Sequence, residues 1–301
     1  MKSLWNAKDA QAAIDRYAAD GIGADLALRV YTTRLLGGEP KLVLHGGGNT
    51  SLKTRITDMV GDEWEVLCVK GSGWDMGSIE PAGLPAVKLA PLRKARAFDV
   101  LSDEDMVKLQ RANLIDPASP NPSVETLMHA FLPHAYVDHT HSTAILSIVD
   151  QPNGQDLCRE IFGDRLGIVD YVAPGFELSK VAAEVYEADP AVEGLILDKH
   201  GIFTFGDTAE SAYERMIEHV TLAEAYIAKG RKSVFAPISL AKTAGLAEVA
   251  PILRGAVAEA LGEGRYARFV LEHRSTPDVD AFVNGRDVED YATRGVSTPI
   301  S

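Results

Sequence analysis

Residues 138–142 read Asp138-His139-Thr140-His141-Ser142. Successive side chains of a β-strand point to opposite faces, so a strand here would place both histidines on one face and Thr140 on the other. Two imidazoles at this spacing can bind one metal ion through bonds of about 2 Å, and a third protein ligand would leave one position open for a substrate. Histidines on half-buried strands also make ordinary hydrogen bonds, so the spacing alone leaves both interpretations open.

Two residues elsewhere in the chain could complete such a site. Asn121 and Pro122 are typical of a helix start, which would place Glu125 in the first turn. An acid there suits the positive end of the helix dipole, and beside a metal it could also act as a general base. His200 stands between two apolar segments that we expect to be strands, so it is either a third ligand or a turn residue.

Glycine-rich segments follow two further predicted strands. Gly47-Gly48-Asn49 comes after residues 41–44, and Lys70-Gly71-Ser72-Gly73 comes after residues 64–69. Successive backbone N–H groups in such loops can form a concave anion site, which would suit a phosphate. Neither segment matches the dinucleotide fingerprint or the P-loop. Both segments could equally be plain turns, with Lys70 a solvated charge.

Length and charge limit the possible classes of protein. The chain has 301 residues, of which 46% are hydrophobic, as in a globular protein of one large or two small domains. A formal net charge of −13 argues against nucleic acid or an anionic membrane as partner. Two cysteines without a CxxC pair suit a reducing cytoplasm, and no apolar run approaches the roughly 20 residues of a membrane span. We therefore expect a cytoplasmic protein.

Several motifs occur together in one order. They are Gly-Gly-Asn-Thr-Ser at 47–51, Lys-Gly-Ser-Gly at 70–73, Ser-Val-Glu at 123–125, His-Thr-His-Ser at 139–142 and Lys-His-Gly at 199–201. In this set the chain resembles the class II aldolase/adducin superfamily over about residues 8–230. It is most similar to the aldolase half of the bifunctional rhamnulose-1-phosphate aldolase/short-chain alcohol dehydrogenases, which also share Pro174-Gly175-Phe176 and the segment 251–255.

The resemblance implies a fold and a set of site residues. The fold would be a three-layer α/β/α domain around a mixed, largely antiparallel sheet, and members are typically C4 tetramers. His139, His141 and His200 would bind one Zn²⁺ or another divalent metal, and Glu125 would be the catalytic acid/base. The substrate phosphate would lie among Gly48, Asn49, Ser72, Gly73 and Ser123. Related aldolases take a proton donor from a neighbouring subunit, for which Glu160 and Tyr171 are candidates.

The implied reaction is cleavage of a ketose 1-phosphate, such as rhamnulose 1-phosphate, to dihydroxyacetone phosphate and an aldehyde. The metal would stabilise the enediolate charge, and Glu125 would move the proton. Epimerisation or dehydration of a sugar phosphate could use the same site. The same residues would also suit a zinc hydrolase with three histidine ligands, and an adducin-like scaffold would have no catalytic role.

The organisation of the chain changes after Gly230. We expect an aldolase-like domain over residues 1–231 and a mainly helical extension over residues 232–301. The bifunctional relatives continue into a dehydrogenase domain, and no GxGxxG fingerprint occurs here. The chain is thus expected to be either a stand-alone aldolase-like protein or one truncated before a further domain.

Overall fold

The computed structural model describes residues 1–44, 47–230, 244–267 and 269–294. The described residues belong to two units, one within residues 1–230 and the other within residues 244–294. The predicted domain boundary between residues 231 and 232 lies outside the described residues.

A seven-stranded sheet forms the centre of the larger unit, with the order β3-β2-β1-β4-β7-β6-β5. Neighbouring strands are antiparallel except for β5 and β6, which are parallel. This arrangement confirms the mixed, largely antiparallel sheet. The strands are β1 (Asn49–Thr57), β2 (Glu63–Val69), β3 (Ala86–Lys88), β4 (Tyr136–Thr140), β5 (Leu166–Val169), β6 (Gly194–Leu197) and β7 (Gly201–Gly206).

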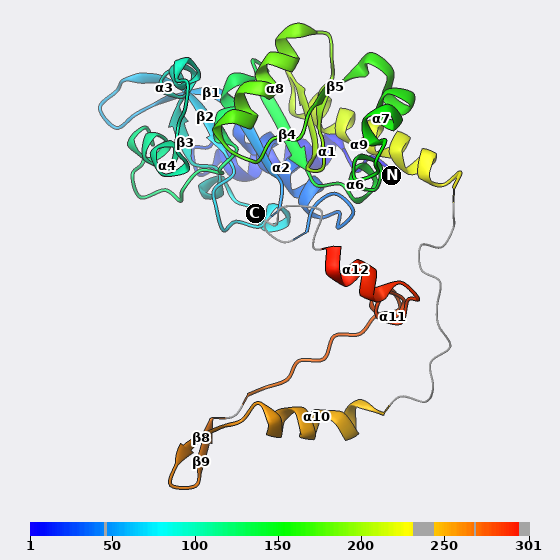
Figure 1. Cartoon of the computed structure of the whole chain (residues 1–301). Helices are drawn as coiled ribbons and strands as arrows, with labels where there is room; N and C mark the ends of the chain where they lie inside the picture. Colours follow the sequence, from blue (N-terminus) through cyan, green and yellow to red (C-terminus); the bar gives the residue numbers. More distant parts are fainter. Residues whose placement is uncertain (45–46, 231–243, 268, 295–301) are drawn as a thin grey trace. The chain divides into compact units, whose positions relative to one another are not determined.

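Helices cover both faces of this sheet (Figure 1), as the predicted three-layer fold requires. One face packs against α1 (Ala7–Ala18), α2 (Ala24–Gly37), α6 (Thr143–Val149), α7 (Gly154–Phe162) and α9 (Ala209–Ile227). The other packs against α3 (Leu89–Lys94), α4 (Asp103–Ala112), α5 (Thr126–Phe131) and α8 (Phe176–Ala188). Short 3-10 turns are η1 (Met76–Ser78), η2 (Pro81–Gly83), η3 (Ala95–Ala97) and η4 (Gly163–Arg165).

Strand β4 lies in the middle of the sheet and is buried on both faces. All five of its residues are buried. Tyr136 packs with the α1–α2 side and Val137 with the α5–α8 side, so the side chains alternate as the strand geometry requires. His139 therefore shares the α5–α8 face with Val137, and it stacks on Phe203 of β7 with ring centroids 4.2 Å apart.

Local signals located some elements correctly and misplaced others. Ser102 caps α4 by accepting a hydrogen bond from the Asp105 amide, and serine is among the residues preferred at that position. The helix expected to begin at Asn121 and Pro122 begins instead at Thr126, so Glu125 occupies the N-cap position rather than the first turn. Residues 41–44, expected to be a strand, form a turn in which the Leu42 and Val43 amides both bond to the Glu39 carbonyl.

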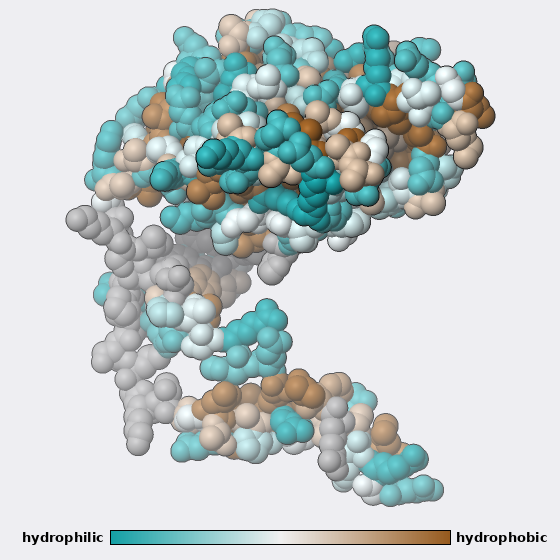
Figure 2. Space-filling model, turned by 180° about the vertical axis from the view of Figure 1, so that it is seen from behind, coloured by the Kyte–Doolittle hydropathy of each residue, from teal (hydrophilic) through white to brown (hydrophobic). Residues whose placement is uncertain are grey.

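The smaller unit contains α10 (Leu246–Ala256), α11 (Pro277–Val283) and α12 (Val288–Arg294). Helices predominate, as predicted, and an additional antiparallel hairpin joins β8 (Glu259–Gly262) to β9 (Arg265–Ala267). Helix α10 exposes several apolar side chains, among them Leu246, Ile252 and Leu253 (Figure 2). Within the described residues, no helix is both long and apolar enough to span a bilayer.

Candidate metal centre

Two neighbouring strands bring three histidines together at one end of the sheet. His139 lies in β4, His141 follows that strand directly, and His200 lies in the turn before β7. Strands β4 and β7 pair antiparallel, with Thr140 opposite Ile202, so the end of one strand meets the start of the other. One ligand atom from each histidine lies within 4.8 Å of the others, which is close enough for all three to bind one ion. The structure thus assembles the three predicted ligands.

The ring nitrogens are arranged as metal ligands require. His139 Nδ1 lies 3.1 Å from the Ile202 carbonyl and donates its proton there, which leaves Nε2 with a free lone pair. His139 Nε2 lies 3.0 Å from His141 Nε2. Two nitrogens at that separation can each lie about 2.1 Å from one ion. Because a carbonyl fixes the tautomer of His139, its lone pair is directed towards the other two rings.

Burial keeps these imidazoles neutral. It lowers the pKa of His141 to about 4, and the neighbouring His200 adds to the effect. Burial also holds the pKa of His139 well below its ordinary value, and it lowers the pKa of His200 despite the opposing charge of Glu125. A metal ion binds only the neutral ring, so a set of three neutral imidazoles fits a divalent ion such as Zn²⁺.

Glu125 directs its carboxylate at the same cluster. Its Oε1 lies 3.2 Å from His200 Nε2, and its Oε2 lies 3.4 Å from His139 Nε2. Its Oε2 also accepts a hydrogen bond of 2.6 Å from Asn49 Nδ2. The carboxylate is buried, so water competes little for it. In this position it can either approach a bound cation or exchange a proton with a substrate atom.

Backbone hydrogen bonds join the two segments that carry the predicted phosphate residues. The Ser72 amide bonds to the Asn121 carbonyl at 2.7 Å, and the Ser123 amide bonds to the Lys70 carbonyl at 3.0 Å. Ser72, Gly73 and Ser123 therefore lie on adjoining segments. This pairing also explains the late start of α5, because it holds residues 121–123 extended beside residues 70–72.

Asn49 and Gly48 connect these segments to the histidines. Asn49 Nδ2 donates to Ser123 Oγ at 3.1 Å as well as to Glu125. Gly48 has φ +69°, and a Cβ there would lie 2.6 Å from Val43 Cγ1 and 2.8 Å from the His139 carbonyl. The two glycine-rich loops and the histidine cluster thus meet at one end of the sheet.

Comparison with known sequences assigns the chain to a family. The family described as Class II Aldolase and Adducin N-terminal domain matches residues 28–227. The chain belongs to the class II aldolase/adducin family. A second family, described as Aldolase class II, second domain, matches residues 244–300. Class II aldolases use a divalent metal and are generally lyases, which agrees with the donor set found here.

Two known proteins are similar to this chain over part of their own length. An uncharacterized oxidoreductase of Bacillus subtilis, YuxG, is 37% identical over 279 residues, which cover 90% of this chain and 40% of that protein. A methylthioribulose-1-phosphate dehydratase of Yersinia enterocolitica is 26% identical over 131 residues, covering 37% of this chain and 62% of that enzyme. The chain thus spans less than two thirds of the length of either protein.

A solved structure agrees over the larger unit. The N-terminal class II aldolase domain of a conserved protein from Thermoplasma acidophilum is 40% identical and superposes with a TM-score of 0.64. The match covers 67% of this chain and 93% of that one. The class II aldolase fold of the larger unit is therefore supported by both sequence and structure.

The two predicted proton donors lie in different places. Tyr171 follows β5 and is 58% exposed, and the Lys199 ammonium lies 5.9 Å from its ring centroid. It is thus near the turn that carries His200. Glu160 lies on the exposed side of α7, where its carboxylate accepts a hydrogen bond from Tyr226 of α9. Within one chain, Glu160 therefore contacts α9 rather than the histidine cluster.

Lys70 and His129 are two buried residues whose interactions at the site the sequence did not indicate. Lys70 is buried and not a solvated charge; burial lowers its pKa, while the charges of Asp75 and Glu125 oppose this effect. His129 is fully buried, as expected of a packed helical histidine, and its ring contacts Asn49 and Ser51. The position of Lys70 directly before a glycine loop could have indicated a place near the site. No local sequence pattern indicated the contacts of His129.

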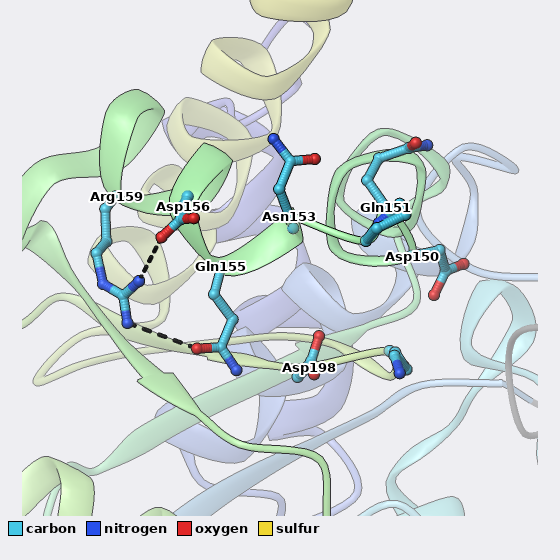
Figure 3. Close-up of a pocket in the computed structure, with 10 residues that line it drawn as sticks. Asp150, Gln151, Asn153, Gln155, Asp156, Arg159 and Asp198 are labelled. Carbon is cyan, nitrogen blue, oxygen red and sulfur yellow. Dashed lines mark hydrogen bonds and ion pairs between the residues drawn. The ribbon is translucent and has the colours of Figure 1, made fainter.

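A separate polar pocket borders residues 198–199, which precede His200 (Figure 3). Its volume is about 500 Å³, and Asp198 and Lys199 form one wall while α7 and the preceding loop form another. Within the lining of this pocket, Arg159 donates hydrogen bonds to Asp156 and Gln155. None of the predicted metal-binding or phosphate-binding residues lines this pocket. It is therefore distinct from the metal centre, although it borders the turn that carries one of the ligands.

Proposed function

We propose that this protein is a zinc-dependent aldolase that cleaves a ketose 1-phosphate, similar to rhamnulose 1-phosphate, into dihydroxyacetone phosphate and an aldehyde. The observation that carries the proposal is the buried carboxylate of Glu125, 3.2 to 3.4 Å from the ligand nitrogens of two histidines. A carbon–carbon lyase needs both an electrophile for developing negative charge and a base close to it. The family assignment supports the same class of chemistry.

Each residue has a defined role in this proposal. His139, His141 and His200 would hold the ion, which supplies Lewis-acid stabilisation of the charge that develops on substrate oxygens. Glu125 would protonate the substrate carbon after cleavage, or remove that proton in the synthetic direction. The carboxylate is oriented for this by the amide of Asn49.

The phosphate would bind at the junction of the two glycine-rich loops. Gly48, Asn49, Ser72, Gly73 and Ser123 are proposed to surround it. Backbone N–H groups and hydroxyls in such loops suit a phosphate, and the nearby ammonium of Lys70 would offset its charge. The bonds between residues 70–72 and 121–123 support this proposal together with the bond from Asn49 to Ser123, because they join both loops to the segment that carries Ser123.

Dehydration of a ketose 1-phosphate is the second candidate function. The motivating observation is the partial match to a methylthioribulose-1-phosphate dehydratase. Removal of a proton from the carbon beside the carbonyl begins dehydration, and it also begins the aldol reaction in the synthetic direction, so the same carboxylate would serve. An epimerase would use the same groups, whereas a non-catalytic scaffold would need none of them.

A substrate panel with a metal-site variant tests the proposal. Wild type and His141→Ala would be assayed for bound zinc by atomic emission, and for aldehyde release from ketose 1-phosphates including rhamnulose 1-phosphate. We expect zinc-dependent cleavage in the wild type and a loss of at least about 100-fold in the variant, since one of three ligands is gone. Water loss without carbon–carbon cleavage would favour the dehydratase, and activity that survives removal of all metal would refute both.

The domain organisation and assembly are further parts of the proposal. We propose residues 1–231 as the catalytic domain and residues 232–301 as an extension of it. The division of the described residues into two units supports this, as do the separate family matches to residues 28–227 and 244–300. We also propose a homotetramer in which a neighbouring subunit supplies the proton donor, with Tyr171 and Glu160 as candidates.

A further inference from the structure

A continuous chain of buried hydrogen bonds runs from β1 through α5 to Glu125. Ser51 Oγ lies 2.8 Å from His129 Nδ1, and His129 Nε2 lies 2.5 Å from Asn49 Oδ1. Asn49 Nδ2 then donates to Glu125 Oε2 at 2.6 Å. His129 and Ser51 are fully buried, and Asn49 and Glu125 are each at most 5% exposed. Water is therefore largely excluded from every link.

The chemistry of the two ends fixes the direction of each bond. An ionised carboxylate only accepts hydrogen bonds, so the Asn49 amide must present its NH₂ group to Glu125. Its carbonyl oxygen then faces His129, which must carry a proton on Nε2 to donate there. With Nε2 protonated on a neutral ring, Nδ1 is an acceptor and receives a hydrogen bond from the Ser51 hydroxyl. Only one arrangement of protons satisfies the whole chain.

Without a donor at His129 Nε2, the Asn49 amide would lose the hydrogen bond that holds its carbonyl oxygen and fixes its position. Rotated by half a turn, it would place its carbonyl oxygen against the Glu125 carboxylate, where two acceptors repel. The second contact of Nδ2, to Ser123 Oγ at 3.1 Å, does not prevent this, because a hydroxyl can act as donor or acceptor. The imidazole and the carboxylate thus favour the same orientation of the amide, and the imidazole is the group that holds its carbonyl oxygen.

We propose that His129 is a positioning residue for the reaction: its Nε2–H orients the Asn49 amide so that the amide holds the Glu125 carboxylate towards the three histidines. This inference rests on the proposed function in one respect, namely that Glu125 is the acid/base. It assigns His129 a role distinct from metal binding and from contact with the substrate. In this proposal Asn49 also orients the Glu125 carboxylate, in addition to its proposed place beside the phosphate.

Two substitutions of His129 separate orientation from packing. His129→Gln places an amide N–H near the position of Nε2, whereas His129→Leu fills similar space without a donor. We expect His129→Leu to lower kcat by about 10- to 100-fold, the range seen when groups behind an active-site residue are removed, with KM and bound zinc nearly unchanged. His129→Gln should regain most of that loss. Equal losses in both variants, or full activity in His129→Leu, would overturn the proposal.

Ser51→Ala provides a milder variant if His129→Leu does not fold. It leaves the imidazole in place but removes the hydroxyl that holds Nδ1 as an acceptor. We expect a smaller fall in kcat with the same unchanged KM. A rise in KM without a change in kcat would count against the proposal, because it would indicate a role in substrate binding.

A measurement without substrate keeps this inference separate from the aldolase proposal. Nitrogen-15 NMR of histidine-labelled, full-length protein would report which ring nitrogen of His129 carries the proton, with His129→Gln used to assign the signal. We expect the Nε2–H tautomer at pH 7, and its weakening in Ser51→Ala. The Nδ1–H tautomer would contradict the proposal even in an active aldolase. If the wild type cleaves no sugar phosphate but shows the Nε2–H tautomer, the aldolase proposal fails and the hydrogen-bond chain stands.

Discussion

The turn before β7 leaves no room for a side chain at Gly201. A Cβ there would lie 2.5 Å from the Thr140 carbonyl and 3.3 Å from ring carbons of both His139 and His141. Lys199, two residues earlier, has φ +56°, a conformation that is costly for a residue with a side chain. This compact turn is what brings His200 up to the end of β4.

Gly201→Ala should therefore disturb the metal centre more than the fold. The added methyl group must displace either the β4 carbonyl or the two rings, so the ligand nitrogens separate. We expect zinc affinity, measured by competition with a chromogenic chelator, to fall by about 10- to 100-fold. Gly23→Ala is the control, since nothing lies within 4 Å of a Cβ at that position. Equal zinc affinity in both variants would show that the turn does not set the ligand geometry.

The sequence could predict the cluster of candidate metal ligands because its geometry is partly local. The alternation of a strand places His139 and His141 together. Local signals made Glu125 and His200 candidates, and the resemblance to a known family favoured their functional interpretation. The bond from His129 to Asn49 could not be predicted in this way, because it joins residues 80 positions apart. Which side-chain atoms meet across a sheet depends on packing that no local pattern encodes.

At the scale of elements, a buried ion pair ties α2 to the strand that carries the histidines. Arg29 Nη2 lies 2.6 Å from Asp138 Oδ1, and both side chains are fully buried. Arg29 also donates to the Ser51 carbonyl and to Thr32 Oγ1. Burial raises the pKa of Asp138, although the Arg29 guanidinium opposes that shift. Each charge therefore depends on the other for its stability in the interior.

Removing one charge of this pair should cost more than removing both. Arg29→Met leaves a buried carboxylate without its partner, and we expect a loss of about 3–5 kcal/mol in the free energy of unfolding. The double variant Arg29→Met/Asp138→Leu should recover most of that loss, because neither charge remains. Urea unfolding of the metal-free wild type, the two single variants Arg29→Met and Asp138→Leu, and the double variant completes a double-mutant cycle. The cycle measures the coupling free energy between the two side chains. Additive losses in the double variant would show that the two residues act independently.

Sequence patterns located elements with strong local signals and misplaced those set by distant partners. Ser102 and Thr208 mark the starts of α4 and α9 because their side chains cap those helices. Asn121 and Pro122 carry an equally plausible start signal, yet the helix begins later because their segment bonds to residues 70–72. A backbone partner about 50 residues away outweighed the local preference.

Across the whole molecule, buried histidines couple folding to pH. Two of them lie apart from the metal ligands: His129 against β1, and His219, which lies 2.9 Å from Glu193 on the other face of the sheet. Burial is the largest cause that lowers the pKa of each in the folded protein. In the unfolded chain both return to an ordinary value of about 6.5. The unfolded state therefore binds more protons than the native state just below pH 6.5.

This difference predicts that the metal-free protein loses stability as the pH falls from 7.5 to 5.5. A histidine with a lowered native pKa contributes stability above its unfolded pKa, and that contribution declines below it, by at most about 1.4 kcal/mol per pH unit for each group. Urea unfolding in the presence of a chelator measures the change, and the window stays above the range in which most carboxylates titrate. His219→Gln removes one titrating group, so the decline should be shallower than in the wild type, whatever the variant's stability at pH 7.5. An identical decline in both proteins, or higher stability at pH 5.5, would show that His219 is not neutral in the folded state.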